Sequence, residues 1–545
     1  MTASDVLVVG GGVAGLRAAL AAKQAGAQVV LLSKTHPLRS HSATSPGGLN
    51  AALGAKDSWE QFLHDTVTAG AALCEPKALN VLCREAGPAV LRLDQWGVPF
   101  TRDHAGKLAR RHLGGHSAAR TIFAADLTGH VILHTLYEQV LHEAIPTYDE
   151  WLVTTLVIED GRCHGVIALE LRTGTLAAFA APAVVLATGG AGCLYDSSTA
   201  SHSCTGDGMS LASRAGVRLM NMEMVQYHPL GFLHHRAFAS EATLAEGAVL
   251  CDHGGQVLSQ GNGQTTRAEL CRVLTSANLG RHDNDGVYLD LRPMGESAIA
   301  AHFPSLQRAA NELMNIALAW EPLPVRPRVH RLLGGIETTA EGATSLPGLF
   351  AAGACACPGV AGANLPAGNA LTASVVFGER AGTSAAAYAK SARPGEIADT
   401  RLQYVQASLA ALDSRLSGED TVTRITRDLE TLMATRVGLV RDGEGLRTAT
   451  QDVALLRDRY ARVGLRHHGK MYNHELLALL ELGSLLDVAE VVIAAAQTRT
   501  ESRGVHQRRD FPAPNEAEWR KHTLVSRSAQ GLHVETRPIN GTSLH

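Results

Sequence analysis

Three glycines near the start of the chain, Gly10, Gly12 and Gly15, have the spacing of a phosphate-binding turn. They follow an apolar run at residues 5–9, and after them Ala and Leu recur at helical spacing as far as Ala25. Such a turn lets the backbone approach a pyrophosphate, whose negative charge is favoured at the start of a helix. The order of strand, glycine turn and helix therefore predicts the binding of a dinucleotide.

The elements that must position this turn indicate one nucleotide-binding fold with insertions. Buried strands are expected at residues 28–32, 183–186 and 348–351, and the last two each run into glycine. The acidic residue that often follows the second strand and binds a ribose is absent, because the chain reads Ser33-Lys34 there. The ribose must therefore be held by other groups.

Composition excludes several classes of protein. The chain has 545 residues, more than one hydrophobic core needs, and its 49 Lys and Arg against 52 Asp and Glu leave a net charge of -3. Because no overall basic field is present, nucleic acid is not an expected partner. The 9 cysteines include no C-x-x-C pair, so no metal or iron-sulfur site is expected within this chain.

No segment has the pattern of a membrane span or a secretion leader. The most apolar helical stretch, residues 476–495, is interrupted by Glu481, Asp487 and Glu490 and cannot cross a bilayer. The first residues run directly into a strand, without a charged region and a cleavage site, so we do not expect this chain to be exported by itself. Any association with a membrane must then come through a partner.

The last third of the chain changes in character. Long amphipathic helical patterns begin at about residue 394 and continue to about residue 495, which predicts a separate helical domain. From about residue 503 the sequence is polar and contains Pro512 and Pro514, so an irregular tail is expected.

Short motifs along the chain occur in the order and spacing of one protein family. They are Arg39-Ser40-His41-Ser42, Gly114-Gly115-His116-Ser117, Asp126-Leu127-Thr128-Gly129-His130, Ala187-Thr188-Gly189-Gly190, Thr205-Gly206-Asp207-Gly208, Gln226-Tyr227-His228-Pro229, Gly334-Gly335-Ile336, Gly362-Ala363-Asn364, Glu501-Ser502-Arg503-Gly504 and Trp519-Arg520-Lys521-His522-Thr523. With these motifs the chain resembles the flavoprotein subunit of succinate dehydrogenase and fumarate reductase, a family that includes L-aspartate oxidase.

The resemblance implies an α/β fold with a Rossmann-like FAD-binding domain, an inserted α+β capping domain, a helical domain and an irregular C-terminal tail. We expect the FAD-binding domain in two parts, with the other domains between and after them. The expected boundaries are 1–228 and 336–393 for the FAD-binding domain, 229–335 for the capping domain, 394–502 for the helical domain and 503–545 for the tail.

The cofactor implied by the resemblance is FAD. His41 matches the histidine to which the respiratory members attach the flavin covalently, and tight non-covalent binding is the alternative. The residues expected to bind FAD are Gly10, Gly12, Gly15, Ser33, Lys34, Ser40, His41, Gly47, Gly48, Ala187, Gly189, Asp207, Gly353, Asn369 and Leu371.

The implied chemistry is hydride exchange between flavin N5 and a saturated carbon next to a carboxylate, with a proton moved on the opposite face. Arg267 matches the family's proton carrier, with Glu241 and Glu269 as candidate relay groups, and a surface salt bridge is the alternative role for Arg267. The remaining catalytic candidates contact substrate carboxylate oxygens in the family: His228, His330 and Ser240, where Ser240 replaces a threonine.

Four positions depart from the family pattern. Leu365 stands where the family has an arginine that clamps a substrate carboxylate, and Ala354 stands where it has an acidic contact to the cofactor. Leu113 replaces a phenylalanine over the substrate, and Leu244 replaces an arginine near the cap. The pocket is thus expected to be less cationic than a succinate site, with a preference for an apolar arm near Leu365.

Two functions remain open at this point. The chain is either an enzyme, acting on succinate and fumarate or on an altered small carboxylic acid, or a catalytically weak flavin subunit that conducts electrons. For unaltered substrates, Arg328 or Arg331 would have to supply the missing charge. The resemblance also implies an iron-sulfur subunit and a membrane anchor subunit as partners, with a cytoplasmic location at the inner face of the membrane.

Overall fold

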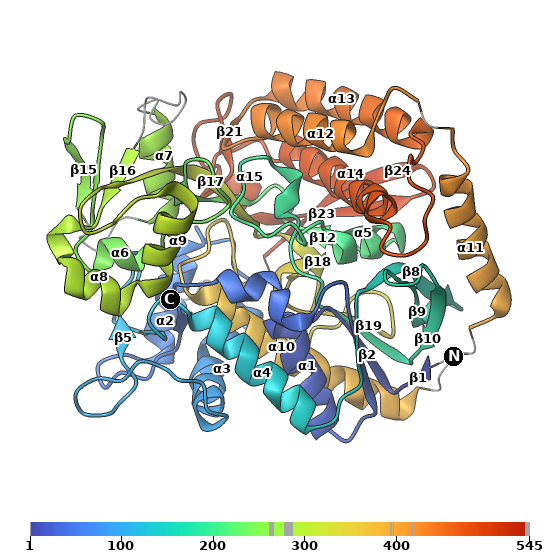
Figure 1. Ribbon diagram of the computed structural model, residues 1–545, viewed down its shortest axis with the longest axis horizontal. Helices are drawn as coiled ribbons and strands as arrows, with labels where there is room; N and C mark the ends of the chain where they lie inside the picture. Colours follow the sequence, from blue (N-terminus) through green and yellow to red (C-terminus); the bar gives the residue numbers. More distant parts are fainter. Residues whose placement is uncertain are drawn as a thin grey trace.

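The computed structural model describes residues 2–260, 266–276, 287–392, 395, 397–416 and 418–539. A parallel five-stranded sheet in the order β19-β11-β2-β3-β7, called the central sheet here, lies beside helices α1 and α10 (Figure 1). Its strands are β2 (Val6–Val9), β3 (Val29–Ser33), β7 (Thr147–Asp149), β11 (Ala183–Leu186) and β19 (Leu349–Ala351). The four strands expected from apolar runs are therefore confirmed.

Both faces of this sheet are buried, as parallel sheets require. Val6 and Val8 of β2 pack on one side with helices α1 (Val13–Gln24), α2 (Trp59–Ala69), α3 (Pro76–Gln95), α4 (Thr128–His142) and α10 (Asn369–Ser391). Leu7 and Val9 face the other side, toward α5 (Asp207–Arg214) and the later helices. Because side chains alternate along the strand, β2 contributes to two separate hydrophobic cores, one on each face of the sheet.

Helices α1 and α10 approach each other very closely. A Cβ added to Gly382 of α10 would lie 2.1 Å from the carbonyl oxygen of Ala18 in α1. Only a residue without a side chain allows this approach, so Gly382 sets the separation of the two helices whose N-termini flank the glycine turn.

Smaller sheets surround the central one. A four-stranded sheet contains β1 (Thr2–Ala3), β10 (Leu176–Ala180), β9 (Arg162–Glu170) and β8 (Trp151–Glu159), and a three-stranded sheet contains β4 (Leu49–Asn50), β6 (Thr121–Ile122) and β5 (Arg110–Arg111). Strand β21 (Val440–Arg441) pairs in parallel with β22 (Gln507–Arg508).

An α+β unit with a core of its own is inserted between β11 and β19 (Figure 1, green, at the left). Its antiparallel sheet has the order β13-β17-β16-β14-β15. The elements are β13 (Val225–Phe232), β14 (Val249–Cys251), β15 (Val257–Gln260), β16 (Val287–Asp290), β17 (Leu323–Leu332), α6 (Ala242–Ala245), α7 (Arg267–Ser276), α8 (Glu296–His302) and α9 (Pro304–Met314). Strands β13 and β17 run from this unit toward the central sheet.

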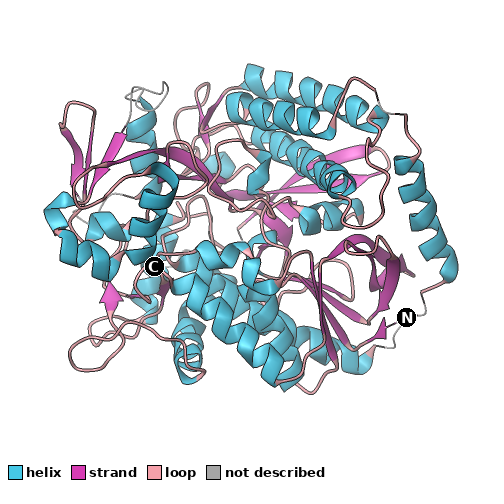
Figure 2. Cartoon of the chain, viewed as in Figure 1, coloured by secondary structure: helices cyan, strands magenta, loops and turns pink. Residues whose placement is uncertain are grey.

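The expected helical region consists of four helices after the last strand of the central sheet (Figure 2). They are α11 (Asp399–Asp413), α12 (Val422–Arg436), α13 (Gly443–Arg462) and α14 (His474–Thr498). None of the helices within the described residues is long and apolar enough to cross a membrane. The boundary that we placed between residues 393 and 394 lies outside the described residues.

The prediction of an irregular tail is wrong. The chain after residue 503 contains α15 (Glu516–Trp519) and a hairpin of β23 (Lys521–Ser528) and β24 (Gly531–Pro538). The hairpin extends a sheet with β12 (Leu219–Met220), β18 (Gly335–Glu337) and β20 (Ala356–Cys357). Strand β23 buries Leu524 and Val525 against partners that lie hundreds of residues earlier, so its polar local sequence carried little signal.

Candidate active site

A long cavity runs along the carboxyl ends of β2, β3 and β11. This is the edge at which open α/β sheets bind their ligands. Of the residues expected to bind FAD, those that line the cavity are Gly10, Gly12, Ser33, Lys34, Ser40, His41, Ala187, Gly189, Asp207, Gly353 and Leu371. Of the expected catalytic residues, His330 lines it as well.

The other four expected FAD residues lie behind the cavity wall. A Cβ at Gly15 would lie 1.8 Å from the carbonyl oxygen of Gly10, so Gly15 allows the turn to pack on its helix. Gly48 has φ +109° and no room for a side chain beside Ile122. Gly47 lies next to Ser240, and the buried side chain of Asn369 bonds to two residues of neighbouring elements, Asn50 and Thr66.

The residues that line the cavity fit FAD in their bare backbone and their unsatisfied groups. A Cβ at Gly10 would lie 2.2 Å from the carbonyl oxygen of Ala187, so the turn presents bare backbone at this point. The start of α1 has no capping side chain at Gly12, which leaves its positive end for an anion. Ser40 Oγ is buried without a hydrogen-bond partner, although Ser40 lines the cavity. Such a group has room for a partner that the chain does not supply, such as a water molecule or a ligand.

A partly buried ionic cluster lies directly after β3, where the acidic residue is missing. Lys34 Nζ lies 2.7 Å from Thr205 Oγ1, from Asp207 Oδ2 and from Glu481 Oε1. Burial lowers the pKa of Lys34, but the two carboxylates outweigh it and raise that pKa above its ordinary value. The cluster joins α14 to the cavity wall, so the helical region helps to shape the cofactor site.

His41 lies in a short 3-10 turn, η2 (His41–Thr44), with its ring in the wall of the cavity. The backbone N–H of Ser201 donates to Nδ1 at 3.3 Å, so Nε2 is the nitrogen that remains for another bond. Burial and the nearby charge of Arg331 lower the pKa of His41 to about 4. The ring is therefore neutral at pH 7, which is the nucleophilic form of an imidazole.

Glu241 lies at the centre of the expected catalytic group. Its Oε2 is 3.1 Å from Nε2 of His228, and its Oε1 contacts Nε of Arg267. Burial raises the pKa of Glu241, but Arg267 and His228 together bring it well below the usual range. Arg267 also donates through Nη1 to Gln226 Oε1 at 3.0 Å, and its side chain is only 10% exposed, unlike a surface salt bridge.

Two other charged groups near Arg267 point elsewhere. Glu269 is exposed, and its carboxylate accepts from the N–H and the hydroxyl of Thr266. Arg272 is exposed and lines a different groove, beside Arg503. Glu241 is therefore the better placed of the two candidate relay carboxylates.

The two expected carboxylate-binding histidines form one buried cluster. The ring centroids of His228 and His330 are 5.0 Å apart, and Phe238 packs against both rings. Nδ1 of His330 is 2.8 Å from the hydroxyl of Thr199, which holds the ring in place. Burial, followed by nearby cations, lowers the pKa of His330 well below its ordinary value. Ser240 directly precedes Glu241 in the sequence and is 4% exposed.

The two arginines considered as replacements for a clamp at residue 365, Arg328 and Arg331, have different surroundings. Arg328 donates to the carbonyl oxygens of Phe232 and Leu233, at 2.7 and 2.9 Å, inside the capping unit. Arg331 lines the FAD cavity instead, and its Nη2 is 3.0 Å from Nε2 of His330. Only Arg331 therefore reaches the site.

The positions that depart from the family pattern lie in two places. Leu113 and Leu244 belong to the apolar core of the capping unit. Leu365 is 7% exposed and borders a second, smaller cavity. Ala354 borders both cavities, so no carboxylate side chain reaches the cofactor from that position.

The sequence reasoning missed several residues of the cavity wall. Ser42 accepts a hydrogen bond from the Val13 N–H at 3.2 Å, and its place beside His41 was the available signal. Trp151 and Leu152 enter the wall from the start of β8, and nothing in their local sequence marks them.

Comparisons with known proteins agree with this geometry. Residues 5–371 match the FAD binding domain family, and residues 426–545 match the C-terminal domain of the fumarate reductase flavoprotein. The chain is 39% identical to the fumarate reductase flavoprotein subunit of Mycobacterium tuberculosis, over 99% of this chain and 98% of that protein. It is 34% identical to the succinate dehydrogenase flavoprotein subunit of Rickettsia bellii, over 99% and 96%.

A solved structure of quinol-fumarate reductase with menaquinol molecules has the same fold. The TM-score is 0.95 at 34% identity, and the match covers 100% of this chain and 99% of that one. The chain therefore belongs to the flavoprotein subunits of the succinate dehydrogenase and fumarate reductase family, which are FAD-dependent oxidoreductases acting on CH-CH bonds.

Proposed function

We propose that this subunit interconverts a saturated carboxylic acid and its enoate. The contact of Glu241 with both His228 and Arg267, beside the cavity that His330 lines, is the observation that supports this most directly. FAD, when bound, supplies a hydride acceptor or donor at its N5 atom. The chain itself must then hold the carboxylate and move a proton at the neighbouring carbon.

Arg267 is the proposed proton carrier. A guanidinium group is protonated at neutral pH, so it can act only if a neighbouring group returns the proton that it gives. Glu241 contacts Nε of Arg267 through one oxygen and Nε2 of His228 through the other, so it is the proposed group that returns the proton. His228 and the hydroxyl of Ser240 are the proposed contacts of one substrate carboxylate.

The character of the other end of the substrate depends on two residues with opposite effects. Leu365 favours an apolar arm, which would gain about 0.8 kcal/mol for each buried CH₂ group. A carboxylate facing Leu365 alone would lose its hydration without gaining a partner. Arg331 borders the same small cavity as Leu365, and its positive charge opposes this preference.

Covalent attachment of FAD through His41 is part of the proposal. The neutral ring of His41 in the cavity wall supports this proposal. Its Nδ1 accepts a hydrogen bond from the Ser201 N–H, and its Nε2 remains for a bond to the flavin. After acid denaturation and desalting, the yellow colour should remain with the polypeptide, and His41→Ala should abolish this. Complete release of flavin from the native protein would show non-covalent binding and would leave the fold unaffected.

The proposed partners are an iron-sulfur subunit and a membrane anchor subunit. A flavin enzyme of this type needs an outlet for electrons, and no group of three His, Cys, Asp or Glu side chains in the described ranges could hold a metal ion. One structural relative is a quinol-fumarate reductase with menaquinol molecules, which supports a quinone-linked complex. We place the subunit in the cytoplasm, peripheral to the inner face of the membrane.

The function can be tested with a panel of saturated acids and their enoates. Saturated acids should bleach the oxidised flavin and enoates should reoxidise the reduced flavin, and both effects should be lost in His228→Ala. If the flavin is reduced and reoxidised by an electron mediator but by no acid of the panel, the chain is instead an electron-conducting subunit.

A further inference from the structure

Residues His330 and Arg331 face the same cavity although they are neighbours in a strand. Side chains of consecutive strand residues normally point to opposite faces. Here Gln226 of β13 pairs with Arg331 and Tyr227 pairs with Val329, so His330 is an extra residue in β17. A bulge of this kind re-aims side chains, and it explains how both groups line the FAD cavity.

Arg331 has no anionic partner among the described residues. Its Nε is buried without a hydrogen bond, and its Nη2 contacts a neutral ring nitrogen of His330. Burial, and then the repulsion of Arg267, lowers the pKa of Arg331 to about 10, which still leaves it charged at pH 7. A buried charge without a partner is costly, so the site favours an anion at this point.

The guanidinium of Arg331 also borders the space next to Leu365. The second cavity is lined by Arg331, Leu365, Gly353, Ala354 and Ala370, and all of these except Leu365 also line the FAD cavity. The two cavities therefore share a wall that includes Arg331. A positive charge from the end of β17 thus reaches the region where residue 365 supplies none.

We propose that Arg331 is a specificity-determining residue that binds the substrate carboxylate beside His330, in place of an arginine at position 365. This inference rests on the proposed function. The two nitrogens that now contact each other, Nη2 of Arg331 and Nε2 of His330, would both bind the entering carboxylate. Arg331 thereby makes the substrate a dicarboxylate, with its second carboxylate near His228 and Ser240.

The test measures equilibrium binding to the flavin-loaded protein. Malonate, a dicarboxylate that lacks an oxidisable CH-CH bond, is titrated against propionate while the visible flavin absorbance is followed. Arg331→Met should weaken malonate about 10-fold or more and propionate much less, because a charge-assisted contact is lost. Arg331→Lys should weaken malonate less, since the charge remains without its paired donors.

Moving the positive charge from residue 331 to residue 365 provides the decisive comparison. In Arg331→Met combined with Leu365→Arg, the affinity for malonate should return to within a few-fold of the native value. Arg328→Lys is the matched control, because Arg328 lies on the same strand with its guanidinium on carbonyl oxygens. This control should leave the ratio of malonate to propionate unchanged.

Two results would overturn the inference. In the first, Arg331→Met leaves malonate binding unchanged while the flavin spectrum or midpoint potential shifts, so that Arg331 serves the cofactor. In the second, the native protein fails to bind malonate although monocarboxylic enoates reoxidise its flavin, so that the function holds without a second anionic subsite. Conversely, Arg331-dependent malonate binding with no reactive acid in the panel would support the inference and refute the proposed function.

Discussion

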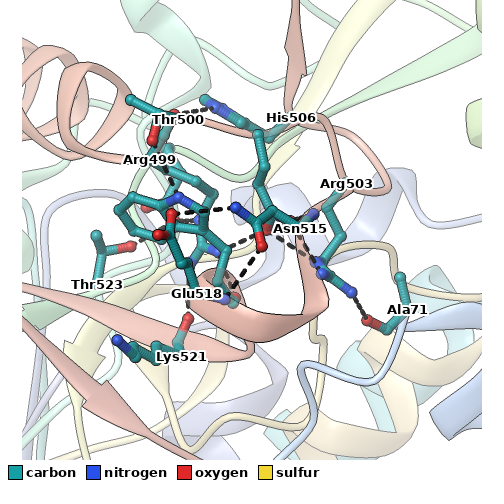
Figure 3. Close-up of polar contacts among 12 residues, drawn as sticks. Ala71, Arg499, Thr500, Arg503, His506, Asn515, Glu518, Lys521 and Thr523 are labelled. Carbon is teal, nitrogen blue, oxygen red and sulfur yellow. Dashed lines mark hydrogen bonds and ion pairs between the residues drawn. The ribbon is translucent and has the colours of Figure 1, made fainter. Parts of the chain in front are cut away.

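Two clusters of buried arginines in this molecule differ in how their charges are balanced. In the first, Arg499 is 0% exposed and lies 2.7 Å from Glu223 and 2.9 Å from Glu501, which are also 0% exposed. Arg499 further donates to the carbonyl oxygens of Trp519 and Lys521, and Arg503 donates to that of Ala71 (Figure 3). Each charged side chain of this cluster has an oppositely charged partner within the fold, although Glu223 Oε2 accepts no hydrogen bond from the described residues.

In the second cluster, at the candidate active site, one positive charge has no carboxylate partner in the ranges that the structure describes. Arg267 has Glu241 as its carboxylate, but Arg331 has none within the described part of the chain. The first cluster connects α14, the tail and the loop at Ala71, and its function is complete without a ligand. We infer from this difference that the balance of charge, and not burial alone, distinguishes structural arginines from the arginines that are proposed to bind a substrate.

The largest effect is expected from breaking the balanced cluster. Arg499→Met would leave Glu223 and Glu501 buried without their shared cation, so the free energy of unfolding should fall by about 3–5 kcal/mol. Chemical denaturation measures this loss. Arg509→Met, at a side chain that is 72% exposed, should change stability by no more than about 0.5 kcal/mol. Equal effects of the two variants would contradict the distinction.

A smaller effect in free energy is expected from removing the paired arginine of the active site. Arg267→Gln should lower kcat by roughly 10²-fold or more, because a positioned proton transfer is lost, while the flavin spectrum stays intact. Arg272→Gln is the control, since Arg272 is exposed on a different groove. Near-full turnover of the Arg267 variant on the true substrate, with loss in the control, would assign the proton transfer to Arg272.

The smallest effect is expected in the pH dependence of malonate binding beside Arg331. His330 is neutral at pH 7 in the free site, because its pKa lies well below the ordinary value. A carboxylate bound between His330 and Arg331 would favour the charged ring and raise this pKa, so malonate should bind with uptake of part of a proton. Its affinity should therefore increase modestly as the pH falls from about 8 to 6.

Calorimetry in two buffers of different ionisation enthalpy measures this proton uptake directly. Arg331→Met should reduce the affinity but keep the uptake, since His330 would still face the carboxylate. Binding without any exchange of protons would show that Arg331 alone meets the anion and that His330 stays neutral.

Much of the site was predictable because its signals are local. The run of apolar residues before Gly10 predicts β2, and the spacing of Gly10, Gly12 and Gly15 predicts the turn between β2 and α1. The expected strands at 183–186 and 348–351 pair in parallel within one sheet, as inferred. These predictions succeeded because backbone conformation and burial of a central strand depend on neighbouring residues.

The wrong prediction of an irregular tail and the alternatives that the sequence left open have a common physical cause. The polar segment of β23 becomes a strand because β12, far away in sequence, offers its edge. Arg328 and Arg331 look equivalent in sequence, and Glu241 and Glu269 do as well. Their roles depend on which groups surround them after folding.

The sequence by itself determined the family, the FAD-binding turn and the identity of the catalytic candidates, because each depends on residue types at set spacings. The tertiary structure alone decided which cation faces the cavity. A bulge in β17 turns Arg331 beside His330, while carbonyl oxygens of the capping unit occupy Arg328. Register between strands and the balance of buried charge arise only when distant segments meet, so no local pattern records them.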